Sequence, residues 1–329
     1  MDSHTSPSAA ASMAPPPAAA PATPHAAWGW WACALAMVTV GSTVVASRLI
    51  SAEVPPFLAT ALRHGMALPF LIALMWARRQ PWPCWAGTSV HDRWLLLAQA
   101  AAGSVGYGVL MLLGLRVASA ADAGILVGTL PAMAGLLAAV VLRERLGRAM
   151  WVALALATLG VMALALGAQA GPGTDSRIDH PHNSGSLTAS ARALGLGLLL
   201  AAVACEAAFI LLHKRLQRPL PALPQSLLMS ALGALLAGTA ACAEAFLQPA
   251  SPSLSSTAWG SLLYYAVVPT VGGFLLWYSG SARLRPSQAA LTTAVAPVAA
   301  LGLSVLVLGE TVSQAQWLGL GAVLASIGL

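Results

Sequence analysis

Charged residues are scarce in this sequence. Asp, Glu, Lys and Arg make up 8% of its 329 residues, whereas a soluble domain carries about 25%. Hydrophobic residues reach 58% and the mean hydropathy is +0.77. The chain lacks the charge to cover a water-facing surface, and its apolar stretches have the roughly 20-residue length that crosses a bilayer. The composition therefore predicts an integral membrane protein.

Several motifs are missing as well. The four cysteines are isolated and form no CxxC pair, so we expect no metal site and no disulfide framework. The net charge of +6 comes from basic residues at the ends of apolar stretches, which argues against a nucleic-acid partner. No HExxH, GxGD or nucleotide-binding motif is present, so we expect neither an enzyme nor a bound cofactor.

The apolar stretches define ten expected spans. They cover 28–47, 56–76, 94–115, 120–142, 148–168, 193–213, 222–244, 258–280, 287–308 and 314–329. Backbone polar groups in hydrocarbon need internal partners, and the spans lack the period-2 alternation of a membrane barrel. The expected fold class is therefore an all-α integral membrane protein with ten transmembrane helices.

A duplication divides these spans into two halves. Proline, glutamate and tryptophan recur at a constant offset of 166 residues (297−131), and so do a basic residue and a second proline. The pairs are Pro131 and Pro297, Glu144 and Glu310, Trp151 and Trp317, Arg48 and Lys214, and Pro55 and Pro221. We expect a disordered cytoplasmic tail over 1–27, a first repeat over 28–168, a flexible periplasmic linker over 169–191 and a second repeat over 192–329. Because five spans are an odd number, the second repeat enters the membrane inverted.

The positions of the basic residues predict the orientation. With a cytoplasmic N-terminus, eleven of the sixteen Lys and Arg residues fall in cytoplasmic loops, four fall outside and Arg63 lies within a span. The eleven are Arg78, Arg79, Arg93, Arg143, Arg145, Arg148, Lys214, Arg215, Arg218, Arg283 and Arg285. The positive-inside rule then places both termini in the cytoplasm.

Two segments of the duplicated unit resemble a known family signature. They are SAADAGILVGTLPAMAGLLAAVVLRE at 119–144 and RPSQAALTTAVAPVAALGLSVLVLGE at 285–310. Each opens with small residues, carries a central proline and ends an apolar run in Glu, and this pattern is similar to that of EamA domains of the drug/metabolite transporter superfamily. The resemblance covers nearly all of 28–329. It implies a ten-helix secondary transporter with cytoplasmic termini, often an exporter of metabolites, amino acids or drugs.

Two charged residues inside spans are the first candidates for a site. Arg63 lies near the middle of the second span, where a charge costs about 2.5–3.5 kcal/mol, so we expect it to face the bundle interior and an anion. Glu206, in the middle of the sixth span, is either its counter-charge or a carboxyl that carries a proton to couple transport. Its counterpart in the first repeat is the apolar Val40.

Polar and aromatic residues in four spans are candidates for the lining of a solute cavity. They are Ser104, Tyr107, Thr129, Tyr265, Thr270, Trp277, Tyr278, Thr292 and Thr293. Packing or a place in the interfacial aromatic belt is the alternative role.

Pro131 and Pro297 are expected to kink their helices and free the carbonyls of Val127 and Thr293. Glu144 and Glu310 are expected to stabilise the N-terminus of the helix that follows each of them.

The expected function is secondary transport of a small organic solute across a bacterial cytoplasmic membrane, as an exporter working by alternating access. The lipid bilayer is the other partner, and protons are a candidate coupling ion. A membrane-embedded enzyme is one alternative. An ion channel is a second, because SVGYG at 104–108 is close to a potassium-filter string, although it lies inside an apolar stretch of helical length.

Overall fold

All regular secondary structure in the described part of the chain is helical. The computed structural model describes residues 24–83, 87–142, 189–247, 254–284 and 295–327, with scattered positions between (148, 151–152, 155–156, 159–160, 289 and 292–293). No strand occurs in these ranges. This agrees with the all-α class. The disordered tail, the linker, Glu144 and most of the fifth expected span lie outside the described residues.

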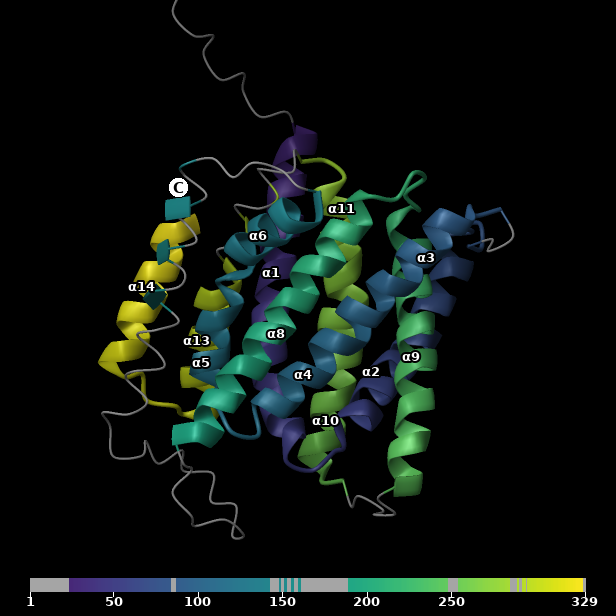
Figure 1. The fold of residues 1–329 in the computed structure, drawn as a ribbon. Helices are drawn as coiled ribbons and strands as arrows, with labels where there is room; N and C mark the ends of the chain where they lie inside the picture. The colour runs from purple at the N-terminus through teal and green to yellow at the C-terminus, as the bar shows by residue number, and fades with distance from the viewer. Residues whose placement is uncertain are drawn as a thin grey trace, which may run out of the picture.

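The helices follow the expected spans closely (Figure 1). They are α1 (Pro24–Ser51), α2 (Pro56–Ala77), α3 (Val90–Gln99), η1 (Ala100–Gly106), α4 (Tyr107–Gly114), α5 (Ala120–Val127), α6 (Leu130–Leu142), α8 (Ala189–Lys214), α9 (Ala222–Leu247), α10 (Ser256–Tyr265), η2 (Ala266–Gly273), α11 (Phe274–Ser281), α13 (Val295–Leu308) and α14 (Gln314–Ile327). Among the described residues, six continuous helical stretches are long and apolar enough to cross a membrane. A seventh span is formed if α5 and α6, bent by 48° at Gly128–Thr129, are taken together.

Serine side chains fix where three of these helices begin. The hydroxyls of Ser89, Ser119 and Ser255 each accept a hydrogen bond from the backbone N–H three residues on, at 3.0–3.1 Å. Each bond satisfies one of the four N–H groups that a helix start leaves without a partner. The N-terminus of α5, which matters for the site below, is defined in this way.

Two spans contain a π-helical segment that the apolar pattern does not predict. η1 separates α3 from α4, and η2 separates α10 from α11. The two segments begin 166 residues apart (266−100), which is the offset of the sequence duplication. The SVGYG string spans the end of η1 and the start of α4, so it is helical and not a filter loop.

The close contacts between helices also follow the 166-residue offset. A side chain placed on Gly114 of α4 would lie 3.1 Å from the carbonyl oxygen of Gly195 in α8. Its counterpart Gly280 in α11 approaches the carbonyl oxygen of Gly29 in α1 in the same way, at 3.0 Å. Small residues allow this close approach of helix backbones in a membrane. In Figure 1 the counterpart helices run in opposite directions: α3 to α4 descends, whereas α10 to α11 ascends.

Replacing Gly41 with alanine should loosen the contact between α1 and α13. The added Cβ would meet Ala296 O at 2.7 Å and Ala300 N at 2.8 Å, both backbone atoms that cannot turn aside. We expect a loss of about 1–3 kcal/mol in stability, measured as a lower melting temperature in detergent. Gly65→Ala is the matched control, because no atom lies within 4 Å of its Cβ and alanine favours the helix. An equal melting temperature for the two variants would contradict this packing.

Candidate functional site

A small cavity near the middle of the bundle is the candidate site. Its volume is about 60 Å³, and its lining comes from α1, α2, α8 and the spans that contain η1 and η2. The polar and aromatic members of the lining are Thr43, Arg63, Tyr107, Glu206, Phe209, Tyr265, Thr270, Phe274 and Trp277. Six of the residues expected from the sequence thus face one space: Arg63, Tyr107, Glu206, Tyr265, Thr270 and Trp277.

Arg63 is buried, with 6% of its surface exposed, and its guanidinium contacts protein groups on two sides. Nη2 donates a hydrogen bond of 2.8 Å to the carbonyl oxygen of Ser104 and lies 2.9 Å from Nε2 of His64. The guanidinium carbon lies 4.5 Å from the centre of the Tyr265 ring, a cation–π distance. Arg63 therefore faces the interior and does not reach out to the membrane surface.

The helix irregularities supply polar backbone groups to this cavity. In a π-helical segment the regular i→i−4 hydrogen bonds are interrupted, and the Ser104 carbonyl in η1 accepts its bond from Arg63. In η2, Pro269 has no N–H to give to the carbonyl of Tyr265, four residues back. The Thr270 hydroxyl donates to that carbonyl at 2.9 Å. In both segments a side chain thus bonds to a carbonyl of the irregular backbone.

Glu206 faces the cavity without a direct partner among the described residues. It is half-buried, and the structure records no hydrogen bond to its carboxylate in the described ranges. It does not reach Arg63 within ion-pair distance, although both residues line the cavity. The ion pair found in the described part of the chain joins Arg192 to Asp122 at 2.9 Å. The Arg63 guanidinium instead bonds to the Ser104 carbonyl and lies over the Tyr265 ring, and its Nε has no hydrogen-bond partner among the described residues.

A larger cavity adjoins the central one and has a volume of about 840 Å³. We call it the vestibule. It lies among α6, the ends of α8 and α11, and the chain between α8 and α9, with His213, Lys214 and Arg283 in its lining. Trp277 lines both cavities, and Tyr278, Thr293 and Pro131 line the vestibule. A solute entering the vestibule would therefore meet Trp277 before reaching Arg63.

Other expected site residues lie elsewhere. Thr129 and Thr292 are buried, and each donates its hydroxyl to the carbonyl three residues back in its own chain segment, at 2.7 Å. They line neither the central cavity nor the vestibule.

Pro131 and Pro297 lie in the first turns of α6 and α13, where a missing N–H costs little. The Thr293 carbonyl, expected to be free, accepts from Ala296 N at 3.1 Å.

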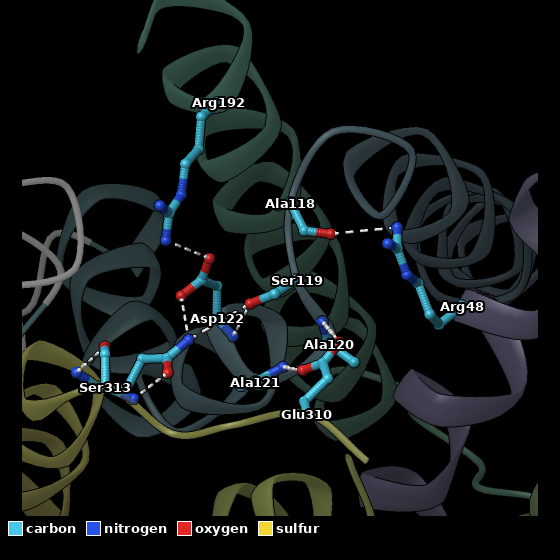
Figure 2. A network of polar contacts seen from close by, with 10 residues as sticks. Arg48, Ala118, Ser119, Ala120, Ala121, Asp122, Arg192, Glu310 and Ser313 are labelled. Carbon is cyan, nitrogen blue, oxygen red and sulfur yellow. Dashed lines mark hydrogen bonds and ion pairs between the residues drawn. The ribbon is translucent and has the colours of Figure 1, made fainter. Parts of the chain in front are cut away.

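The end of the bundle opposite the vestibule is held by polar contacts (Figure 2). Arg48, in the last turn of α1, donates to the carbonyl of Leu115 and, at 3.5 Å, to that of Ala118. Asp122 accepts from Arg192 of α8 and from Gln316 of α14, both at 2.9 Å. These contacts tie α5 to helices of both halves of the chain.

Glu310 also forms polar contacts at this end of the bundle, and its partners differ from the expected ones. Its two carboxylate oxygens accept from the backbone N–H groups of Ala120 and Ala121, at 3.1 and 2.8 Å. It therefore stabilises the N-terminus of α5, in the other half of the chain, and not α14, which follows it. The start of α14 is instead capped by Ser313 and Gln316, which bond to each other's backbone N–H.

Sequence reasoning missed three groups of the two cavities. Phe209 and Phe274, which stack with ring centres 6.0 Å apart, form an aromatic wall of the central cavity. Thr43 lines it too and lies 3.2 Å from the Tyr107 hydroxyl. His213 lies at the vestibule and packs 5.0 Å from the ring of Tyr278. Thr43 could have been found as a polar residue in the middle of the first span, but phenylalanines in an apolar span give no such signal.

Helices that cross a membrane, with a polar cavity between them and a vestibule at one end, define a multi-pass membrane protein of the transporter class. The profile of the EamA-like transporter family matches residues 27–166 and 193–329. The chain belongs to that family.

Relatives in two bacteria agree with this assignment. The chain is similar to the uncharacterized transporter YetK of Bacillus subtilis, at 32% identity over 89% of this chain and 84% of that protein. It is also similar to the uncharacterized transporter sll0355 of Synechocystis sp., at 25% identity over 88% and 85% of the two chains. A crystal structure that is described only as that of a protein shares the fold, with a TM-score of 0.59 and 19% identity over 91% of this chain and 95% of that one.

The hydrogen bond that compensates Pro269 can be tested by a double-mutant cycle. Thr270→Val keeps the shape of the side chain but removes the hydroxyl that donates to the buried Tyr265 carbonyl, so we expect a loss of about 0.5–1.5 kcal/mol, measured from thermal unfolding. Pro269→Ala in that background returns a backbone N–H and should recover part of the loss. Thr239→Val is the control, since that hydroxyl is exposed. If Pro269→Ala recovers nothing, the missing N–H is not the cause.

Proposed function

We propose that the protein is a secondary transporter that exports a small organic solute across the bacterial cytoplasmic membrane by alternating access. Family membership makes it a membrane transporter, with a small solute and the lipid bilayer as its partners. The proposal rests above all on one observation: a central cavity with Arg63, Glu206 and aromatic walls adjoins a vestibule at one end of the bundle, while polar contacts close the other end. That is the arrangement expected of one state of an alternating-access carrier.

The domain organisation belongs to this proposal. We infer two inverted five-helix repeats over 28–168 and 192–329, preceded by a tail over 1–27 and joined by a linker over 169–191. The shared 166-residue offset of η1 and η2, and of the two glycine contacts, supports a duplicated scaffold. The opposite directions of the counterpart helices support the inversion (Figure 1).

The orientation follows from the charge distribution, with both termini in the cytoplasm. The vestibule then faces the cytoplasm, because its basic residues Lys214 and Arg283 belong to the cytoplasmic set. A cytoplasmic vestibule suits an exporter, whose solute enters from inside the cell.

Thiol labelling from outside intact cells tests this orientation. In a chain without its own four cysteines, we expect Gln217→Cys to stay unlabelled by a membrane-impermeant reagent and His180→Cys in the linker to react. Gln217 suits the purpose because it is exposed, whereas its neighbour Leu216 is buried. Labelling of both positions after the membrane is opened shows that each thiol is reactive. The reverse pattern in intact cells would place the vestibule outside.

The lining indicates the kind of solute. Arg63 can bind an anionic group, Glu206 a cationic one, and Phe209, Phe274 and Trp277 an apolar body. An amino-acid-like or drug-like molecule carries these features. At about 60 Å³ the central cavity must widen to hold such a molecule, so Tyr107, Tyr278, Thr129, Thr292 and Thr293 stay candidates for contact with it.

Glu206 is the proposed coupling group, which would exchange a proton as the solute binds or leaves. Its carboxylate faces the cavity and has no hydrogen bond or ion pair among the described residues. A carboxyl held by a fixed partner could not change its protonation state as readily. The chain also offers few alternatives in the described spans, because Asp122 is bonded to Arg192 and Gln316.

Counterflow in proteoliposomes tests the transport mechanism and the coupling together. Wild-type protein should show uptake of labelled solute stimulated by unlabelled solute inside, for a compound chosen from a panel of amino acids and toxic analogues that protects growth. Glu206→Gln should keep this exchange but lose uptake driven by a pH gradient, because an amide cannot carry the proton. Glu244→Gln, on α9 away from the cavity, is the control.

The outcomes separate the competing functions. Flux without stimulation from the far side would indicate a channel, and chemical conversion of the solute would indicate an enzyme. If Glu206→Gln retains gradient-driven uptake at the wild-type rate, another group couples transport or none does.

A further inference from the structure

We propose that Arg48 and Lys214, the paired basic residues of the duplication, are alternating clasps, each closing its own end of the transport path by binding two carbonyls of its own repeat. The inference rests on the proposed inverted repeats, and it assigns residues to the two gates. The observation behind it is a contrast between the two ends of the bundle: one clasp is closed and its counterpart is open.

The closed clasp is formed by Arg48 (Figure 2). Its guanidinium bonds to the carbonyls of Leu115 and Ala118, in the turn between α4 and α5. The α4 end has carbonyls without helical partners, and an arginine can donate to two of them at once. The contact joins the last turn of α1 to the end of α4.

The open clasp is found by adding the 166-residue offset. Arg48 maps onto Lys214, Leu115 onto Ser281 and Ala118 onto Leu284. All three counterparts line the vestibule. Within the described residues, Lys214 is exposed and makes no hydrogen bond to either carbonyl. The same three positions are therefore in contact at the closed end and separated by a cavity at the open end.

A basic residue in the last turn is favourable for any helix, and that alone would place Arg48 and Lys214 at these helix ends. The helix dipole does not require Arg48 to reach the α4–α5 turn, nor the counterpart residues to face each other across the vestibule. An ammonium group has three donors, so Lys214 can hold the Ser281 and Leu284 carbonyls when the vestibule closes. Arg48 would release its pair in that state, opening the other end.

Two equivalent positions report which end is open. Ser47, next to Arg48, is fully buried, and its counterpart His213 (47+166) lines the vestibule. In a chain without its own cysteines, Ser47→Cys and His213→Cys give one thiol for each end. A small charged methanethiosulfonate, applied to opened membranes so that both ends are reached, should label His213→Cys quickly and Ser47→Cys slowly.

The two clasp variants should shift these rates in opposite directions. Arg48→Gln weakens the closed clasp, so labelling of Ser47→Cys should rise by about tenfold while that of His213→Cys falls. Lys214→Gln should slow Ser47→Cys further and leave His213→Cys fast. Arg48→Lys keeps a donor at this position, so it should keep most of the wild-type ratio between the labelling rates of Ser47→Cys and His213→Cys. Arg215→Gln, which removes the neighbouring exposed charge outside the vestibule, should change neither rate.

Three results would overturn the assignment. The ratio of the two labelling rates could stay unchanged in both clasp variants, the two variants could shift it in the same direction, or Arg215→Gln could shift it as much as they do. Lys214 is exposed, so its variant tests the clasp even if Arg48→Gln does not fold. Labelling needs no solute, so it is independent of counterflow. If counterflow is seen but the labelling rates do not shift in opposite directions, the clasp proposal is wrong and the transporter proposal stands. If the rates shift in opposite directions but no counterflow is seen, the proposed transport cycle is wrong and the clasp assignment stands.

Discussion

The membrane imposes one constraint on which this structure depends: each backbone N–H and C=O in hydrocarbon must find a partner inside the protein. Regular helices meet it along most of the described chain. Where the helical pattern is interrupted, at η1, at η2 and at Gly128–Thr129, other groups must supply the missing bonds. These interruptions bring polar groups to the middle of the membrane. Arg63 bonds to the Ser104 carbonyl in η1, and the Thr270 hydroxyl bonds to the Tyr265 carbonyl, to which Pro269 has no N–H to donate.

The same constraint explains why a charge can stay in the cavity. A central arginine is expensive in a bilayer, but the Ser104 carbonyl and the Tyr265 ring receive the Arg63 guanidinium without using an acidic side chain. Glu206 is thus not consumed in a fixed ion pair. A helix with regular hydrogen bonding could not have offered that carbonyl so readily, and the pairing of Arg63 with Glu206 would then have been the simpler arrangement.

The sequence predicts the helices well because the length and polarity of each span depend only on the bilayer. It also directs attention to Arg63 and Glu206, because a charge within an apolar span stands out. It does not reveal η1 and η2, since glycine and a single proline are compatible with an unbroken membrane helix. It misses the target of Glu310 because that contact joins the segment after α13 to α5, over 189 residues of chain, and no local pattern encodes such a distance. Contacts between the halves are decided by packing, which one sequence does not display.

The basic pair Arg48 and Lys214, repeated at the 166-residue offset, lies at the two ends of the bundle. The two charged residues of the central cavity have no chemical equivalent at that offset: Arg63 corresponds to Met229 and Glu206 to Val40. A carrier with one binding site has to close two ends in turn, so closure requires two copies of the closing groups. The solute meets one cavity whichever end is open, so its binding groups need only one copy, and the second repeat is free to lose them. The proposed division of labour therefore follows from the geometry of alternating access, with symmetry at the gates and asymmetry at the site.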